Sequence, residues 1–383
     1  MKKEVNNIEE NLTEIENDII ENPMDGYITD PFSTKDIKIT NAVISLSSLI
    51  NRLKEDYDEI DLNPDFQRHA NLWNQTSMSR LIESILLKLP LPIFYFDVSN
   101  PDKWIVVDGL QRLSTIKKFV VDKKLKLKNL EFLTDLNGKS YDELERTYKR
   151  VIDETQIITY QIEAQTPKEV RYSIFNRINT GGLSLNAQEI RQALNQQGKG
   201  ITFLDKCSQN QIFKKIVNAP SKRMLDRELI LRFIAFKLTE NAYKNFPYNT
   251  MGEFLDKAME KLDDIQDNTR LEKLQIQLID TLRFSEQVLG EGHRFSRSIA
   301  DNNKTKTLNR SLYDVITVCF SNIDHQEKFL SNKDIFIKKF LKLLQNESSD
   351  FSKAITEGTS GKNAIEKRFE IMENLIAEVM NED

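Results

Sequence analysis

The residues best suited to do chemistry are Asp-Gly-Leu-Gln-Arg at positions 108–112. They bring a carboxylate, an amide and a guanidinium to the point where an apolar run, 104–107, gives way to hydrophobic residues at helical spacing. Gly109 permits a sharp turn between the two. The first turn of a helix presents unpaired N–H groups and a positive dipole end, which favour a bound anion such as phosphate. The stretch therefore predicts an anion-binding turn, to which Arg112 adds a forked contact.

The same stretch also has a purely structural interpretation. Asp108 would then be only the N-cap of the helix, and Arg112 a solvated residue on its surface. The elements around the turn and the other motifs of the chain are needed to choose between the two interpretations.

A hairpin and several helices must position this turn. Residues 93–98 and 104–107 flank a Ser-Asn-Pro-Asp turn and predict two antiparallel strands that lead into Asp108. Upstream, hydrophobic residues at helical spacing predict an amphipathic helix over 78–89, ended by prolines 90 and 92. A further strand is predicted over 156–163, followed by a helix that opens with Thr-Pro-Lys-Glu at 166–169.

The second half of the chain is predicted to be helical, because strand patterns disappear after about Gly200. The clearest helical segments are 225–238, 271–289, 312–320 and 335–344. The expected fold class is α+β, with a mixed sheet and helices followed by an all-helical region. The expected organisation is an acidic arm over 1–30, a first domain over 31–200 and a helical domain over 201–383.

Composition is typical of a globular protein, with 39% hydrophobic and 30% charged residues in 383. No run approaches the ~18 apolar residues of a membrane-spanning helix, and the first residues lack a signal-peptide core. We therefore expect a cytoplasmic protein without a membrane partner. Only two cysteines are present, and neither Cys-x-x-Cys nor clustered histidine occurs. Any metal should be held by oxygen ligands.

The net charge of −5 is unevenly distributed, because residues 1–25 carry −6 and the remainder +1. We expect this acidic leader to be a disordered arm. Hydrophobic residues at helical spacing allow it instead to fold against a partner; they are Ile8, Leu12, Ile15 and Ile19. The near-neutral remainder neither requires nor excludes nucleic acid, since binding needs only a local basic groove.

Four motifs in order resemble one family. They are Asn-Pro-Asp-Phe-Gln-Arg at 63–68, Leu-Pro-Leu-Pro-Ile at 89–93, the 108–112 stretch, and Phe-Asn-Arg-Ile-Asn-Thr-Gly-Gly at 175–182. This order is similar to that of the amino-terminal domain of GmrSD-type restriction endonucleases, which have a ParB/sulfiredoxin-like fold. The similarity extends into the helical half, at 226–232 and 358–368.

The resemblance implies a nucleotide-handling domain in bacterial defence against phage or foreign DNA. The usual family signature, Asp-Gly-Gln-Gln-Arg, is linked to binding and hydrolysis of a nucleoside triphosphate, with Mg²⁺ as the expected cofactor. Such domains are often followed by an HNH nuclease domain, in the same chain or in a partner. Here the three histidines are scattered, at 69, 293 and 325, so we expect this chain to lack the nuclease half.

The resemblance also assigns site residues. The expected catalytic residues are Asp108, Gln111 and Arg112: Asp108 holds the metal or orients water, Gln111 positions the nucleophile and Arg112 takes phosphate charge. The expected nucleotide-binding residues are Gly109, Gln67, Arg68, Arg177, Asn179 and Gly181. Structural interpretations stay open for these as well, as a solvated loop at 67–68 and a simple helix stop at 179–181.

One position departs from the signature, because Leu110 stands where the family has its first Gln. If that Gln positions water, hydrolysis here is slow or absent and the site is a sensor. If it is structural, Leu110 packs beneath the helix with Leu113 and Phe119, the account that we favour.

The leading hypothesis is an enzyme that binds and hydrolyses a nucleoside triphosphate as the regulatory or motor step of a restriction-type system. The rival is a non-catalytic DNA-binding or interaction subunit that recruits a separate nuclease. Nuclease activity of the ParB-like fold itself ranks last. The expected partners are thus the nucleotide, with DNA and a nuclease subunit as further candidates, and the expected state is an oligomer.

Overall fold

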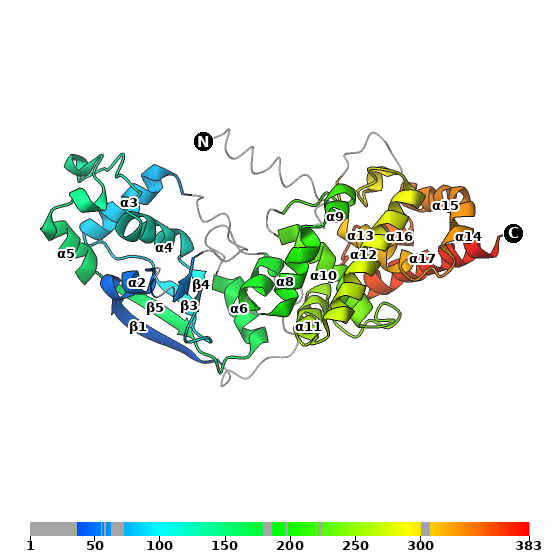
Figure 1. Ribbon diagram of the computed structural model, residues 1–383, viewed down its shortest axis with the longest axis horizontal. Coiled ribbons are helices and arrows are strands. Elements are labelled where there is room, and N and C mark those ends of the chain that lie inside the picture. The colour runs from blue at the N-terminus through cyan, green and yellow to red at the C-terminus, as the bar shows by residue number, and fades with distance from the viewer. Residues whose placement is uncertain are drawn as a thin grey trace. The chain divides into compact units, whose positions relative to one another are not determined.

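The computed structural model (Figure 1) describes residues 37–54, 56, 59–62, 73–178, 186–195, 198–221, 224–299 and 307–382. The chain divides into two compact units. We call the one that spans Ile28–Leu194 the sheet unit, and the one that contains Asn195–Asp383 the helical unit.

The sheet unit is built on five strands in the order β1-β5-β3-β4-β2. The strands are β1 Ile39–Ser45, β2 Ile60–Asp61, β3 Phe94–Asp97, β4 Trp104–Asp108 and β5 Gln156–Ile162. β1 runs antiparallel to β5, and β3 antiparallel to β4, whereas β5 and β3 are parallel, as are β4 and β2. The sheet is therefore mixed, and the β3–β4 hairpin predicted from the sequence is confirmed.

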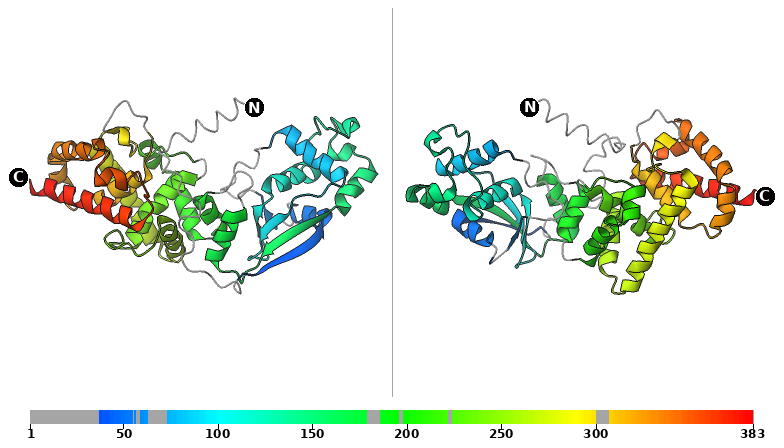
Figure 2. Two further views of the ribbon diagram at one scale, coloured as in Figure 1. Left: turned by 180° about the vertical axis from the view of Figure 1, so that it is seen from behind. Right: turned by 45° about the horizontal axis from the view of Figure 1, so that its top comes forward.

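Helices cover one face of this sheet (Figures 1 and 2). The helices of the unit are α2 Leu46–Arg52, α3 Gln75–Leu86, α4 Leu110–Ile116, α5 Arg146–Glu154, α6 Lys168–Ile178 and α7 Ala187–Leu194. The core that α2 to α5 form with the sheet includes Phe94, Phe96 and Val106, each at most 1% exposed. α6 packs separately against β4. The turn after β4 therefore lies between a buried strand and a buried helix.

The described part of the helical unit has no strand beyond two isolated bridges. Its helices are α8 Lys199–Ser208, α9 Gln211–Ile216, α10 Leu225–Leu238, α11 Met251–Asp263, α12 Asn268–Leu289, α13 Arg310–Phe320, α14 Gln326–Ser331, α15 Lys333–Gln345, α16 Asp350–Ala354 and α17 Lys362–Asn381. α10 is buried around most of its circumference, as expected of a helix at the centre of an α-helical core. None of the described helices is long and apolar enough to cross a bilayer.

The α+β class predicted from the sequence is confirmed, with a small mixed sheet followed by an all-helical region. The predicted helix over 225–238 coincides with α10, and the one over 78–89 is α3, which ends before the two prolines. The sequence patterns did not single out β1 or β2. β1 is hard to recognise because Ile39 and Val43 are exposed on the sheet edge, at 38% and 65%.

Candidate functional site

The turn after β4 depends on Gly109. This residue is the N-cap of α4 and has φ +105°, in the left-handed region that favours glycine. A Cβ atom at this position would lie 2.5 Å from Cδ1 of Phe94 on the neighbouring strand. The backbone therefore passes too close to the hairpin for any other residue, which fixes the place where Asp108 ends the strand and α4 begins.

Arg112 is buried beneath this turn, with 8% of its surface exposed. Its guanidinium donates hydrogen bonds to the Pro92 carbonyl, to the Ile93 carbonyl at 2.9 Å and to Asp108 Oδ2 at 3.0 Å. Its Cζ lies 4.2 Å from the centre of the Phe94 ring, a cation–π contact. Burial lowers the pKa of Arg112 and Asp108 opposes this shift, yet the group keeps its charge. Arg112 thus joins the Leu-Pro-Leu-Pro-Ile segment to the turn.

The structural interpretation of the turn is wrong for both Asp108 and Arg112. The N-cap is Gly109 and not Asp108, and Arg112 is a buried ion-pair partner and not a solvated helix residue. One oxygen of the Asp108 carboxylate accepts a hydrogen bond from Arg112. The Asp108 side chain is nevertheless 44% exposed, so the carboxylate is also open to solvent. The turn therefore presents an oriented, accessible carboxylate.

The two residues between Gly109 and Arg112 have different environments. Leu110 is 9% exposed and belongs to the core with Leu113 and Phe119, each 0% exposed. Gln111 is half-buried, and its Oε1 is shielded from solvent. The packing account of Leu110 is therefore the one that agrees with its position in the fold.

The remaining predicted site residues are only partly described. Arg177 lies exposed in the last turn of α6. Gln67, Arg68, Asn179 and Gly181 lie outside the described residues. At the start of α7, the backbone N–H of Asn186 donates to the Glu189 side chain at 2.7 Å and the backbone N–H of Glu189 donates to the Asn186 side chain at 2.8 Å, which is a capping box. The structure thus brings together Asp108, Gly109, Gln111 and Arg112.

No group of three or more His, Cys, Asp or Glu side chains in the described residues is arranged to hold a metal ion. Mg²⁺ does not require such a group, because it is often held by one or two carboxylates together with substrate phosphates and water. The accessible Asp108 carboxylate has the hard oxygen donors that such a site needs. The carboxylate therefore offers the kind of oxygen ligand that Mg²⁺ takes in proteins.

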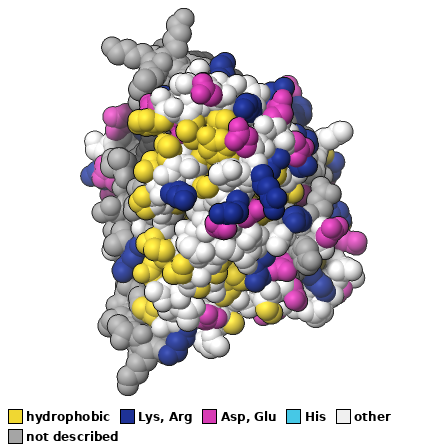
Figure 3. Space-filling model, turned by 90° about the vertical axis from the view of Figure 1, so that its left-hand side faces the viewer, with side chains coloured by type: hydrophobic (Ala, Val, Ile, Leu, Met, Phe, Trp, Pro, Cys, Tyr) yellow, Lys and Arg dark blue, Asp and Glu magenta, His cyan; other side chains and the backbone are white. Residues whose placement is uncertain are grey.

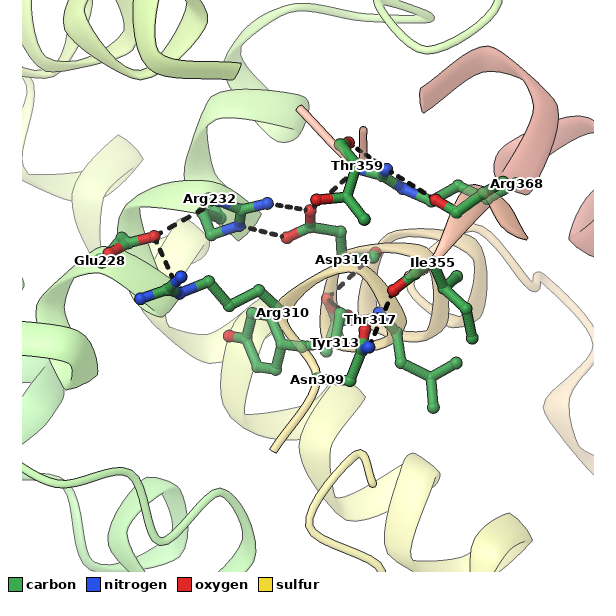
Figure 4. Close-up of polar contacts among 12 residues, drawn as sticks. Glu228, Arg232, Asn309, Arg310, Tyr313, Asp314, Thr317, Ile355, Thr359 and Arg368 are labelled. Atoms are coloured by element: carbon green, nitrogen blue, oxygen red, sulfur yellow. Dashed lines mark hydrogen bonds and ion pairs between the residues drawn. The ribbon is translucent and has the colours of Figure 1, made fainter. Parts of the chain in front are cut away.

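A second cluster of charges lies inside the helical unit (Figure 4). Asp314 of α13 is fully buried and accepts hydrogen bonds from Arg232 Nε at 2.9 Å and Arg232 Nη2 at 2.7 Å. Arg368 of α17, also 0% exposed, donates to the same carboxylate at 3.3 Å and to the Thr359 carbonyl at 2.6 Å. The motifs at 226–232 and 358–368 therefore meet at one aspartate.

The cluster extends along α10. Glu228 lies within 3.3 Å of Arg232 and within 3.4 Å of Arg310, and Arg227 forms an ion pair with Asp205. Arg227 and Arg232 of α10 are thus buried ion-pair partners and do not form a surface face. Sequence reasoning missed Asp314; the available signal was a single carboxylate within the apolar helix 310–320, since a buried charge needs a partner.

Comparison with known proteins identifies part of the chain. Residues 46–196 match the family described as GmrSD restriction endonuclease, N-terminal domain. The matched segment contains all four motifs on which the resemblance was based, among them the turn at 108–112. The comparisons with curated proteins and with solved structures gave no match. The resemblance inferred from the motifs is therefore confirmed over this segment.

Proposed function

We propose that the protein is the nucleotide-binding component of a restriction-type defence system, because residues 46–196 match the amino-terminal domain family of GmrSD restriction endonucleases. The observation that carries the proposal is the accessible Asp108 carboxylate, which the buried Arg112 orients at the signature turn of that domain. The proposed reaction is hydrolysis of a nucleoside triphosphate, which would couple nucleotide state to the action of the system.

In this proposal Asp108 supplies the carboxylate that holds Mg²⁺ or orients the attacking water. The ion, when bound with the nucleotide, neutralises phosphate charge. Gln111 follows in the first turn of α4, where its amide would position water, and the exposed Arg177 is a candidate phosphate contact.

The contacts of Arg112 favour a role other than the phosphate contact predicted from the sequence. Its guanidinium is hydrogen-bonded to two backbone carbonyls and to Asp108, and its face covers the Phe94 ring. A phosphate would have to compete with these bonds. We therefore propose that Arg112 is a positioning residue that acts through Asp108.

The proposal is tested by measuring Mg²⁺-dependent nucleotide binding and turnover for the wild type and Asp108→Asn. Asp102→Asn is the matched control, because Asp102 is an exposed carboxylate on the preceding β3–β4 turn. Loss of a charged contact should weaken binding or turnover at least about tenfold in Asp108→Asn and leave Asp102→Asn unchanged. Equal binding and turnover in all three proteins would remove Asp108 from the site.

A nuclease assay separates this function from the third hypothesis. The purified chain should leave duplex DNA intact in the presence of Mg²⁺. Cleavage that persists through purification and disappears in Asp108→Asn would instead assign nuclease chemistry to the sheet unit.

A further inference from the structure

A segment of the sheet unit displays lysines in a regular row. Between Lys123 and Leu133 the chain runs without regular secondary structure, and its residues alternate. Leu125 and Leu127 are buried, at 2% and 1% exposed, whereas Lys124, Lys126 and Lys128 are exposed. We call residues 123–133 the lysine strap. In an extended chain alternate side chains lie on one side, so the three ammonium groups face solvent together.

The strap is anchored along α3. Gln75 donates to the Lys126 carbonyl at 2.8 Å, and Ser79 Oγ accepts from the Lys128 amide at 2.9 Å. Near its end the buried Glu83 carboxylate accepts three successive backbone N–H groups, from residues 131, 132 and 133, at 2.7 to 3.0 Å. These bonds fix the backbone of the strap before any ligand is present.

The loop held by Glu83 presents an aromatic ring to solvent. Phe132 is 73% exposed, the largest exposure among the large hydrophobic side chains of the described residues. Three backbone N–H groups satisfy the buried Glu83 carboxylate, and the loop that they order holds the Phe132 ring largely in solvent. The strap therefore carries a row of ammonium groups and an exposed aromatic ring on one ordered segment of backbone.

Charge on the strap is only partly neutralised. Neighbouring cations are paired, Lys117 with Asp122 and Lys123 with Asp142, and the exposed Arg80 lies against Glu131. For Lys124, Lys126 and Lys128 no ion pair with a described carboxylate is seen. Figure 3 shows the side of the sheet unit where α3 and α5 lie, on which Lys and Arg side chains, with Asp and Glu side chains among them, lie between areas of hydrophobic side chains.

We propose that the lysine strap and Phe132 bind single-stranded nucleic acid. A positive row that follows the sugar-phosphate backbone, combined with an aromatic platform for an unpaired base, is the recognition chemistry of sequence-tolerant single-strand binding. A duplex offers its phosphates to the lysines but no base to the ring, since its bases are stacked on one another. Phe132 therefore selects the single strand, and the lysines supply most of the affinity.

This site shares no residue with the turn at 108–112 and does not rest on the proposed nucleotide chemistry. The test is fluorescence anisotropy with the full chain, a labelled 16-nucleotide oligo-dT and a labelled 16-base-pair duplex, over a range of salt. The strap variant is Lys124→Gln/Lys126→Gln/Lys128→Gln. The charge-matched control is Lys333→Gln/Lys338→Gln/Lys353→Gln, three exposed lysines of the helical unit.

The strap variant should bind oligo-dT at least about tenfold more weakly and show a salt dependence shallower by about two in log–log slope. Phe132→Ala should weaken binding about fivefold or more at unchanged slope, and Phe132→Tyr should restore it. The control triple variant and Asp108→Asn should bind as the wild type does. Melting temperatures should be unchanged, because every substituted strap residue is exposed.

The proposal is overturned if the wild type does not bind oligo-dT at physiological salt, or if both triple variants lose affinity equally. It is also overturned if the duplex binds as tightly as oligo-dT and Phe132→Ala has no effect, since the surface would then recognise phosphate charge alone.

Discussion

The guanidinium of Arg112 lies against the ring of Phe94, with Cζ 4.2 Å from the ring centre, and the same ring leaves no space for a side chain at Gly109. One phenylalanine of β3 therefore determines both the path of the turn and the position of the arginine that orients Asp108.

Gly109→Ala should destabilise the protein more than Gly138→Ala. Both glycines have positive φ, at +105° and +86°, but a Cβ at Gly138 would meet no atom within 4 Å. Gly138→Ala should cost about 1–2 kcal/mol of backbone strain, and Gly109→Ala about 1–3 kcal/mol more for the clash with Phe94. Denaturant unfolding measures both. Equal losses would mean that the hairpin relaxes away from the new methyl group.

Leu110→Gln, which restores the usual family residue, should lower stability and not raise turnover. Leu110 is buried against the core, so desolvation of the new amide should lower the free energy of unfolding by about 1–3 kcal/mol. Leu110→Met is the control and should cost less than about 1.5 kcal/mol. Melting temperature and hydrolysis rate are measured together. Faster hydrolysis at unchanged stability would show that the wild type lacks a water-positioning amide.

Asp314→Ala should be strongly destabilising, because it leaves the buried Arg232 and Arg368 without their shared carboxylate. Removing one partner of a buried ion pair typically costs about 3–5 kcal/mol. Asp280→Ala removes a surface partner of Arg283 in the same unit and should cost about 0–1 kcal/mol. A small loss for Asp314→Ala in urea unfolding would indicate that water or other groups satisfy the two arginines.

Glu83 should make the sheet unit sensitive to acid. Burial by itself would raise the pKa of Glu83, but three backbone N–H groups and Arg80 lower it, and the net direction is downward. A lowered carboxyl pKa gives stability that is present above the unfolded value of about 4.3 and is lost as pH falls through the folded value. Glu83→Gln should therefore be about 1–3 kcal/mol less stable than the wild type at pH 7.

That difference should shrink as the pH falls below about 4.3, because the carboxyl of the unfolded wild type then takes up a proton while the folded one stays ionised until its lower pKa is reached. Unfolding curves of the two proteins between pH 7 and pH 3 provide the measurement. A gap that stays constant with pH would mean that Glu83 acts through packing and not through its charge.

The sequence by itself determined the local elements. The spacing of hydrophobic residues predicts the bounds of α10, and turn residues predict the hairpin and the turn at Gly109. Such patterns depend only on residues close together in the sequence. The four motifs in order also identified the family that residues 46–196 match. The roles of Asp108 and Gln111 in nucleotide chemistry stay predictions.

Only the tertiary structure decided what the charged side chains contact. Arg112 meets the carbonyls of Pro92 and Ile93, and Asp314 receives arginines that lie 82 and 54 positions away. Glu83 likewise binds amides that lie 48 to 50 positions later in the chain. Local spacing specifies which face a residue occupies, but the partner of a buried charge is set by the packing of distant elements, because burial without that partner would be unfavourable.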